Sequence, residues 1–301
     1  MIELMITVLI SICLFLLGSA LGSFAAATVW RLRVRQLADD KKAGLTVEGS
    51  EKTQVKRLAM RSKTAALKDR SICLHCGREL RAYDLIPVVS WVSTRGKCRT
   101  CKKPIGKMEI LAEVLVGASF VVSYLVWPYV FDTQGIVYFV IWCIMLVLLA
   151  VHWMYDARWF LLLDRITILI TILALIFVSL RLADIPAPLL GGELLGLGIT
   201  LAVLPGFYGL LYVISRGGWI GFGDVKLLVP FALMLPSWEY GVLLIFLANL
   251  IGCLVLLPAM VSKKLSRTSR VPFGPFLIAA FVITVLFGQN ILDFYIGTVL
   301  F

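Results

Sequence analysis

The apolar residues of this chain are gathered into long runs separated by short polar turns. A helix needs about 20 largely apolar residues to cross a bilayer, because its backbone polar groups must all be satisfied within the helix. The pattern therefore predicts an all-α polytopic membrane protein with about eight transmembrane helices, of which the sixth is short for a full span. The predicted spans are residues 4–29, 110–131, 135–155, 166–182, 190–214, 225–235, 240–261 and 272–287.

The overall composition supports this interpretation. Of the 301 residues, 60% are hydrophobic and 16% are charged, and the mean hydropathy is +0.94. These values exclude an ordinary soluble globular protein and make the lipid bilayer a partner of the chain. The first apolar run is too long for a secretory signal and lacks a basic start, so we interpret it as a retained anchor.

The net charge of +11 is concentrated in one polar segment. Between Arg31 and Lys107 there are twenty Lys and Arg residues and seven Asp and Glu residues. The positive-inside rule places such a segment in the cytoplasm, with the N-terminus outside, and explains the charge without nucleic acid. Counting spans from there also places the later basic residues inside: Arg158, Arg165, Arg216, Lys226, Lys263, Lys264, Arg267 and Arg270.

The polar segment has two parts of different character. We predict a first transmembrane helix over 1–30, a basic cytoplasmic linker over 31–70, a cytoplasmic cysteine module over 71–108 and a transmembrane bundle over 109–301. Residues 36–70 are rich in Lys, Ala, Ser and Thr and lack an apolar cluster, which is typical of a flexible or marginally helical segment.

Four cysteines form two Cys-x-x-Cys pairs at the spacing of a zinc ribbon. A reducing cytoplasm argues against structural disulfides, so we predict a Zn²⁺ site, with a redox dithiol pair as the alternative. Four thiolates leave zinc no open position, which makes the site structural. The predicted ligands are Cys73, Cys76, Cys98 and Cys101.

Two aspartates, Asp156 and Asp224, fall at predicted span ends on the same side of the membrane. Ionisable residues there are costly and are candidates for function. Two carboxylates at one depth provide the pair that an aspartyl protease needs, one to activate water and one to polarise the scissile carbonyl. Gly221 and Gly223 would let a substrate backbone approach Asp224, although a glycine-rich helix start explains the same pattern. Asp156 could also simply mark the end of a span.

Two further polar residues lie near this pair. His152 precedes Asp156 by one helical turn, and we interpret it as a buried, locally solvated histidine rather than a proton relay. Asp164 stands directly before an apolar run and is a candidate N-cap of the fourth helix.

Taken together, these motifs resemble the type 4 prepilin peptidases, which are bifunctional leader peptidase and N-methyltransferase enzymes of the GxGD aspartyl protease type. The likeness covers nearly the whole chain apart from the linker. It is carried by Gly22-Ser23-Phe24, Arg31-Leu32, the cysteine module from Cys73 to Ile105, Glu113, Leu162-Leu163-Asp164, Gly221-x-Gly-Asp224-Val-Lys226 and Pro272-Phe273-Gly274-Pro275.

The resemblance implies specific roles. Asp156 and Asp224 would be catalytic, and Glu113 would contact the cofactor. Gly221, Gly223, Lys226 and Asp164 would support the catalytic pair. Substrates would be prepilins or pseudopilins, cleaved after a Gly on the cytoplasmic face of a bacterial inner membrane. The new N-terminal residue would be methylated with S-adenosylmethionine as donor.

Two alternatives remain. The family's Asn after Gly-Ser-Phe is replaced by Ala26, and its Pro before Asp164 by Leu163, so a peptidase without methyltransferase activity is the first. The second is a non-enzymatic membrane scaffold or transporter with a zinc ribbon. The first cleaves but does not methylate a prepilin, and the second does neither.

Overall fold

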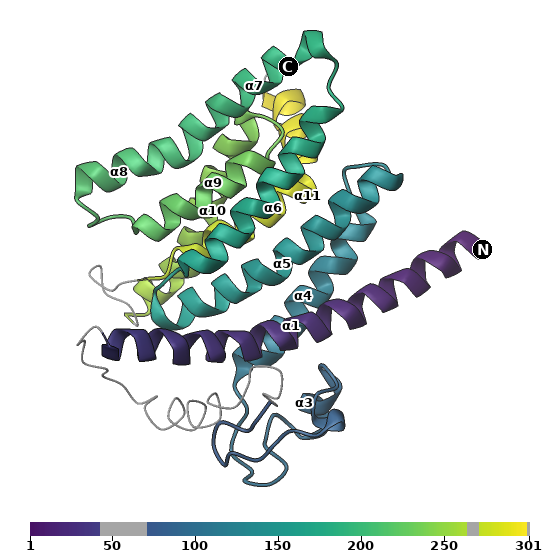
Figure 1. Ribbon diagram of the computed structural model, residues 1–301, viewed down its shortest axis with the longest axis vertical. Helices are drawn as coiled ribbons and strands as arrows, with labels where there is room; N and C mark the ends of the chain where they lie inside the picture. Colours follow the sequence, from purple (N-terminus) through teal and green to yellow (C-terminus); the bar gives the residue numbers. More distant parts are fainter. Residues whose placement is uncertain (43–70, 264–270, 300–301) are drawn as a thin grey trace. The chain divides into compact units, whose positions relative to one another are not determined.

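The structure is a computed structural model that describes residues 1–42, 71–263 and 271–299. Most of the predicted linker, residues 43–70, lies outside the described residues. The chain divides into two compact units, Met1–Leu125 and Val126–Phe301. Within the described ranges the protein is helical and has no strand beyond isolated bridges (Figure 1).

The first unit is built on two helices, α1 (Ile2–Lys42) and α4 (Lys107–Leu125). Glycines let their backbones approach closely. A Cβ on Gly18 would lie 2.9 Å from Gly117 Cα, and one on Gly22 would lie 2.6 Å from the carbonyl oxygen of Ala112. Helix α1 continues beyond the apolar run because the following Arg, Gln, Leu and Ala residues are good helix formers.

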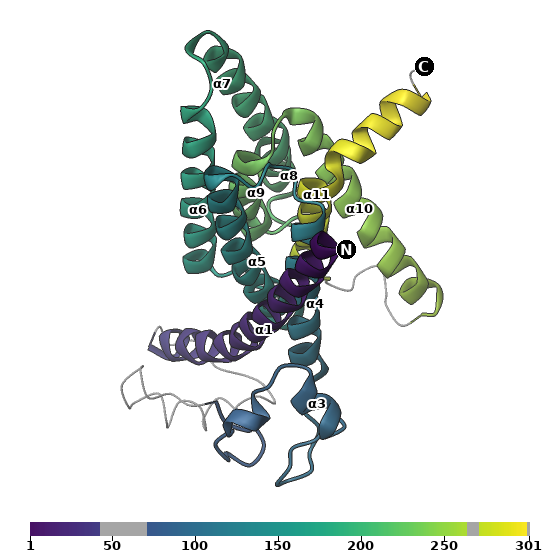
Figure 2. The ribbon, with the colours of Figure 1, turned by 90° about the vertical axis from the view of Figure 1, so that its right-hand side faces the viewer.

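The cysteine module precedes α4 in the chain and lies at its N-terminal end (Figure 2). It contains two short elements, η2 (Ala82–Asp84) and α3 (Val89–Ser93). One isolated bridge closes each of its two loops, between Ile72 and Glu79 and between Lys97 and Pro104. These are the paired turns expected of a ribbon-like module.

The second unit consists of helices joined by short turns. They are α5 (Thr133–Trp159), α6 (Asp164–Ala183), α7 (Ala187–Leu201), η3 (Ala202–Gly206), α8 (Phe207–Ser215), α9 (Phe222–Met234), α10 (Trp238–Val261) and α11 (Gly274–Val299). The segment from α7 to α8 is one long helix with a π turn at η3, which contains Pro205 (Figure 1).

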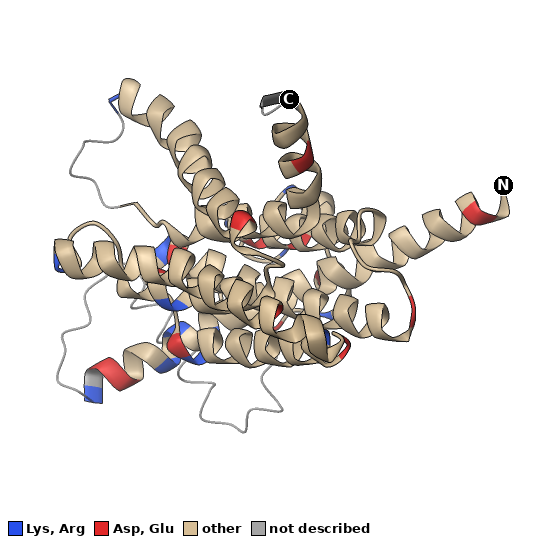
Figure 3. Ribbon diagram, turned by 90° about the horizontal axis from the view of Figure 1, so that it is seen from above, with Lys and Arg blue, Asp and Glu red and all other residues tan. Residues whose placement is uncertain are grey.

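Seven helices of the described chain are long and apolar enough to cross a membrane. The sixth predicted span, residues 225–235, corresponds to α9, which has only 13 residues. Charged residues occupy little of the helical ribbon (Figure 3). The prediction of an all-α polytopic membrane protein is therefore confirmed, although the sixth predicted span is a helix too short to count among the seven.

Aromatic packing holds together the three helices that carry the site of the second unit. Phe231 of α9 and Phe281 of α11 stack with ring centroids 3.9 Å apart, and Trp142 of α5 contacts the same Phe281 at 5.7 Å. All three side chains are fully buried. Burial of side chains this large fixes α5, α9 and α11 against one another.

Candidate active site and metal centre

Asp156 and Asp224 are brought together by the fold of the second unit. Asp156 lies in the last turn of α5 and Asp224 in the first turn of α9, and their exposed fractions are only 5% and 9%. Leu162 lies beside Gly223, which directly precedes Asp224, and beside Gly274, which contacts Asp156. The structure therefore places two buried carboxylates, 68 residues apart in sequence, near the same connection between α5 and α6.

Helix α5 ends one turn after Asp156 for a local reason. Phe160 adopts the left-handed conformation, with φ 56°, and its N–H donates to the carbonyl oxygen of Asp156 at 2.9 Å. This cap stops the helix and starts the short connection to α6. Asp156 therefore lies at the C-terminal end of α5, next to the connection to α6, and not in the middle of the helix.

Asp156 has a partner that the sequence motifs alone do not reveal. The backbone N–H of Gly274, at the start of α11, donates to Asp156 Oδ2 at 3.0 Å. A Cβ on Gly274 would lie 2.7 Å from the same oxygen, so only glycine permits this approach. The Pro-Phe-Gly-Pro stretch was the available signal, but nothing in it specifies which carboxylate it contacts.

Gly221 and Gly223, which precede Asp224, both lie where an added side chain would crowd its neighbours. Gly221 is the N-cap of α9, and a Cβ there would lie 3.3 Å from Asp224 Oδ2. A Cβ on Gly223 would lie 3.2 Å from Leu162 Cβ, in the connection between α5 and α6. The glycines thus keep side-chain bulk away from the carboxylate and admit the neighbouring loop.

The remaining predicted support residues form an ion pair. Lys226 Nζ of α9 donates to Asp164 Oδ1, at the start of α6, at 2.8 Å. Asp164 has no capping hydrogen bond, since the N-cap position of α6 is Leu163. The interpretation of Asp164 as an N-cap is therefore wrong, and its carboxylate instead binds the lysine that follows Asp224.

Tyr208 of α8 is a further residue of this site that sequence reasoning missed. Its ring is 3% exposed, and its hydroxyl accepts a hydrogen bond from Asn249 Nδ2 at 3.3 Å. The ring stacks on Phe273, directly before Gly274, with ring centroids 6.0 Å apart. In the sequence, a tyrosine beside the site looks the same as a tyrosine that only packs in an apolar helix, so no signal could have identified Tyr208.

The four predicted metal ligands come together in the first unit. The Sγ atoms of Cys73, Cys76, Cys98 and Cys101 all lie within 4.8 Å of one another, and those of Cys73 and Cys101 are 3.9 Å apart. A tetrahedral zinc with Zn–S bonds of about 2.3 Å separates its sulfur atoms by about 3.8 Å. The donor set and its spacing therefore fit zinc.

The second cysteine loop is also prepared electrostatically for a metal. Burial alone would raise the pKa of the Cys98 thiol, but the backbone N–H groups of Cys101 and Thr100 outweigh burial and lower it to about 6. Burial raises the pKa of Cys73 to about 12. The lowered pKa of Cys98 favours the thiolate form that metal binding requires.

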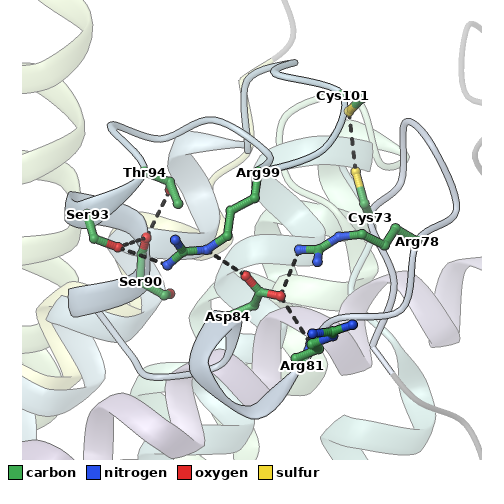
Figure 4. A network of polar contacts seen from close by, with 9 residues as sticks. All are labelled: Cys73, Arg78, Arg81, Asp84, Ser90, Ser93, Thr94, Arg99 and Cys101. Atoms are coloured by element: carbon green, nitrogen blue, oxygen red, sulfur yellow. Dashed lines mark hydrogen bonds and ion pairs between the residues drawn. The ribbon is translucent and has the colours of Figure 1, made fainter.

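An aspartate joins the two cysteine loops (Figure 4). Asp84 Oδ2 accepts from Arg78 of the first loop at 2.7 Å, and Oδ1 accepts from Arg99 of the second at 3.0 Å. Burial works to raise the pKa of Asp84, but the Arg81 backbone N–H and the two guanidinium groups lower it. The Asp84 carboxylate is thus a charged bridge across the module.

A cavity of about 230 Å³ lies between the module and its supporting helices, entirely within the first unit. Its walls include Trp30 and Arg31 of α1, Trp91 of α3 and Glu109 and Glu113 of α4. Glu113 is 9% exposed, and one of its oxygens, Oε2, accepts a hydrogen bond from the Val88 N–H at 2.7 Å. The predicted cofactor residue therefore lines a cavity that contains both aromatic rings and carboxylates.

Comparison with known proteins agrees with the division into two units. Residues 16–127 match the family described as Bacterial Peptidase A24 N-terminal domain, and residues 143–257 match the Type IV leader peptidase family. The four cysteines and Glu113 fall in the first match, whereas Asp156 and Asp224 fall in the second.

Several curated relatives are similar over most of their length. A prepilin leader peptidase/N-methyltransferase of Burkholderia pseudomallei strain 1026b is 30% identical over 283 residues, which are 90% of this chain and 84% of the relative. Proteins of the same name from Stutzerimonas stutzeri and Pseudomonas aeruginosa are each 28% identical over 289 residues, covering 95% of this chain and 93% of the relative. No solved structure matches the chain significantly. With a 30% identical relative aligned over most of both chains and with both family regions in order, the chain belongs to the type IV leader peptidase family.

Proposed function

We propose that this protein removes the leader peptide of prepilins or pseudopilins and methylates the N-terminus that cleavage exposes. The observation that carries the peptidase activity is the pair of buried carboxylates, Asp156 and Asp224. Curated relatives that align over most of the chain are named for both activities.

The geometry suits water-mediated peptide hydrolysis. A pair of interacting carboxylates holds one proton between them, so one carboxylate takes a proton from water while the other hydrogen-bonds the scissile carbonyl oxygen. The water oxygen bonds to the carbonyl carbon, the C–N bond breaks, and the leaving amine takes a proton from the pair. Because Gly274 engages Asp156 Oδ2, Oδ1 is the oxygen left to face the water.

The peptidase proposal is tested by replacing each aspartate with its uncharged isostere. Asp156→Asn and Asp224→Asn should each abolish leader removal from a co-expressed prepilin at unchanged protein level. Asp293→Asn, which alters a carboxylate near the C-terminal end of α11, is the control. Cleavage by either active-site variant at the wild-type rate would contradict the catalytic assignment. A transporter or scaffold predicts no cleavage by the wild type either.

The second activity would use the cavity of the first unit. S-adenosylmethionine carries a cationic sulfonium and an adenine ring, and bound in this cavity it would supply an electrophilic methyl group. The indole rings of Trp30 and Trp91 suit cation and base stacking, and Glu109 and Glu113 suit positive charge. Of the Glu113 carboxylate, Oε1 is available to receive the proton that an α-ammonium group must lose before it is nucleophilic.

Mass spectrometry of the mature pilin tests both activities at once, since it reports the cleavage point and the methyl group together. Glu113→Gln should give cleaved pilin without the methyl group, and binding of S-adenosylmethionine to the purified variant, measured by calorimetry, should weaken. Unmethylated product from the wild type would support a peptidase that lacks the transferase. Full methylation by Glu113→Gln would contradict the assignment of Glu113 to the methyltransferase site.

The zinc is proposed to be structural, and the charge distribution supports a cytoplasmic module with an external N-terminus in a bacterial inner membrane. Both basic termini of the polar segment, Arg31 and Lys107, would then face inside. Labelling of single introduced cysteines in intact cells with a membrane-impermeant reagent tests this: a cysteine at Glu3 should react, and one at Lys107 should not.

A further inference from the structure

One buried polar side chain is not used by the proposed reaction. His152 lies in α5, one turn before Asp156, and none of its surface is exposed. Its Nε2 is 3.1 Å from Thr167 Oγ1 of α6, while Nδ1 has no hydrogen-bond partner among the described residues. Burying an imidazole with one nitrogen unpaired costs free energy, so His152 calls for an explanation beyond packing.

The contact of His152 is with the beginning of α6. Thr167 is 6% exposed and lies in the first turn of that helix. Its hydroxyl is also 3.3 Å from the carbonyl oxygen of Leu163, the residue at which α6 starts. The histidine therefore ties the Asp156 helix to the exact turn where α6 begins.

The same turn of α6 is tied to the helix of the second aspartate. Asp164 pairs with Lys226, two residues after Asp224. Leu162, in the connection before α6, is the side chain closest to a Cβ built on Gly223 and also lies beside Gly274. The start of α6 thus contacts both elements that carry the catalytic carboxylates and the loop that holds Asp156.

We propose that His152 is a positioning residue for the peptidase reaction: its hydrogen bond to Thr167 holds the start of α6 against α5 and thereby sets the placement of Asp224 relative to Asp156. The inference rests on the proposed peptidase function. It assigns no proton transfer to the imidazole, because no hydrogen bond joins His152 to either aspartate in the described part of the chain.

Thr167 gives a cleaner test than His152, since Thr167→Val keeps the side-chain volume and removes only the hydroxyl. Thr171 is a matched control: it lies one turn later in α6, and its hydroxyl donates only to the backbone carbonyl of Thr167 at 2.8 Å. Thr171→Val therefore makes the same chemical change on the same helix without touching His152. Thr167→Ser restores the hydroxyl.

The measurement is steady-state cleavage of a purified prepilin by the full-length enzyme, together with the melting temperature of each variant. Misplacing reacting groups by about 1 Å costs up to about 100-fold in rate, so Thr167→Val should lower kcat by about tenfold and change KM by less than about twofold. Thr171→Val and Thr167→Ser should stay within about twofold of wild type in both parameters. His152→Ala should lower kcat at least as much as Thr167→Val.

A second variant tests whether the ion pair acts through the same helix start. Asp164→Asn combined with Thr167→Val should lower kcat by less than the product of the two single effects, because both bonds hold one element. A kcat for Thr167→Val equal to that of Thr171→Val overturns the proposal, as does an equal loss in Thr167→Ser. Absence of cleavage by the wild type overturns the peptidase function itself, which is a different result.

Discussion

The backbone N–H of Gly274 donates to Asp156 Oδ2 at 3.0 Å, across 118 residues of sequence. This contact makes the start of α11 part of the proposed active site and leaves no room for a side chain at position 274. It also fixes the orientation of the Asp156 carboxylate.

We predict that Gly274→Ala lowers the rate of leader cleavage by about 10- to 100-fold, because the methyl group displaces either Asp156 or the start of α11. The rate is measured with purified prepilin. Gly252→Ala is the control, since a Cβ there would meet Phe276 at an ordinary distance of 3.5 Å. Equal rates in the two variants would show that the approach to Asp156 is not needed.

The close crossing of α1 and α4 leads to a prediction about methylation. A Cβ on Gly22 would lie 2.9 Å from Glu113 Cα as well as 2.6 Å from the Ala112 carbonyl oxygen. Gly22→Ala should therefore displace Glu113 and lower methylation of the mature pilin by about tenfold or more while cleavage continues. Gly196→Ala, where nothing lies within 4 Å of the new Cβ, should change neither. Equal loss of cleavage and methylation in Gly22→Ala would indicate general misfolding instead.

Zinc content provides a direct check of the cysteine module. Purified protein should carry about one zinc per chain by elemental analysis, and Cys98→Ser with Cys101→Ser should reduce this to near zero. Cys143→Ser with Cys253→Ser changes two membrane-helix cysteines and should leave the zinc in place. Zinc retained by the first double variant would exclude the four-thiolate site.

Asp84 should stabilise the module through its two arginines. Asp84→Asn removes the charge from both ion pairs and should make the module release zinc to a chelator at least about tenfold faster, consistent with about 1.5–3 kcal/mol for a hydrogen bond to a charged group. Arg81→Gln, which keeps the backbone N–H that Asp84 accepts, is the control.

The pH dependence of this effect has a defined sign. Because the pKa of Asp84 is lowered from 3.8, its stabilising contribution is complete above that value and is lost as the pH falls through the folded-state pKa. The difference between wild type and Asp84→Asn should thus be constant from about pH 8 to about pH 5. A difference that disappears within this range would mean that another group carries the effect.

Much of the fold and of the candidate site could be predicted from sequence because the signals are local. Runs of apolar residues indicate helices, the Cys98-x-x-Cys101 spacing indicates a metal-binding loop, and Asp224 after Gly223 indicates a carboxylate flanked by glycine. Each depends on neighbours within a few residues. Helix α1 is an exception, since it continues through polar positions that the hydrophobic pattern excludes from the span.

The contacts between distant elements could not be predicted in this way. Nothing near Gly274 indicates that its N–H meets Asp156, and nothing near Thr167 indicates that its hydroxyl meets His152. Such pairings are set by how the helices pack, and helix packing depends on side chains such as Phe231 and Phe281 that look like ordinary apolar residues in sequence. The same applies to Asp164, whose carboxylate binds Lys226 rather than its own helix.

The shortness of α9 has a consequence for the supply of water. Its 13 residues extend only about 20 Å, against a hydrocarbon thickness of about 30 Å. Nine of these residues are buried, so neighbouring helices and not lipid surround most of α9. Asp224 stands in its first turn, so the short helix leaves the carboxylate at one end of the bundle, and we expect the water for the proposed hydrolysis to reach it from that end.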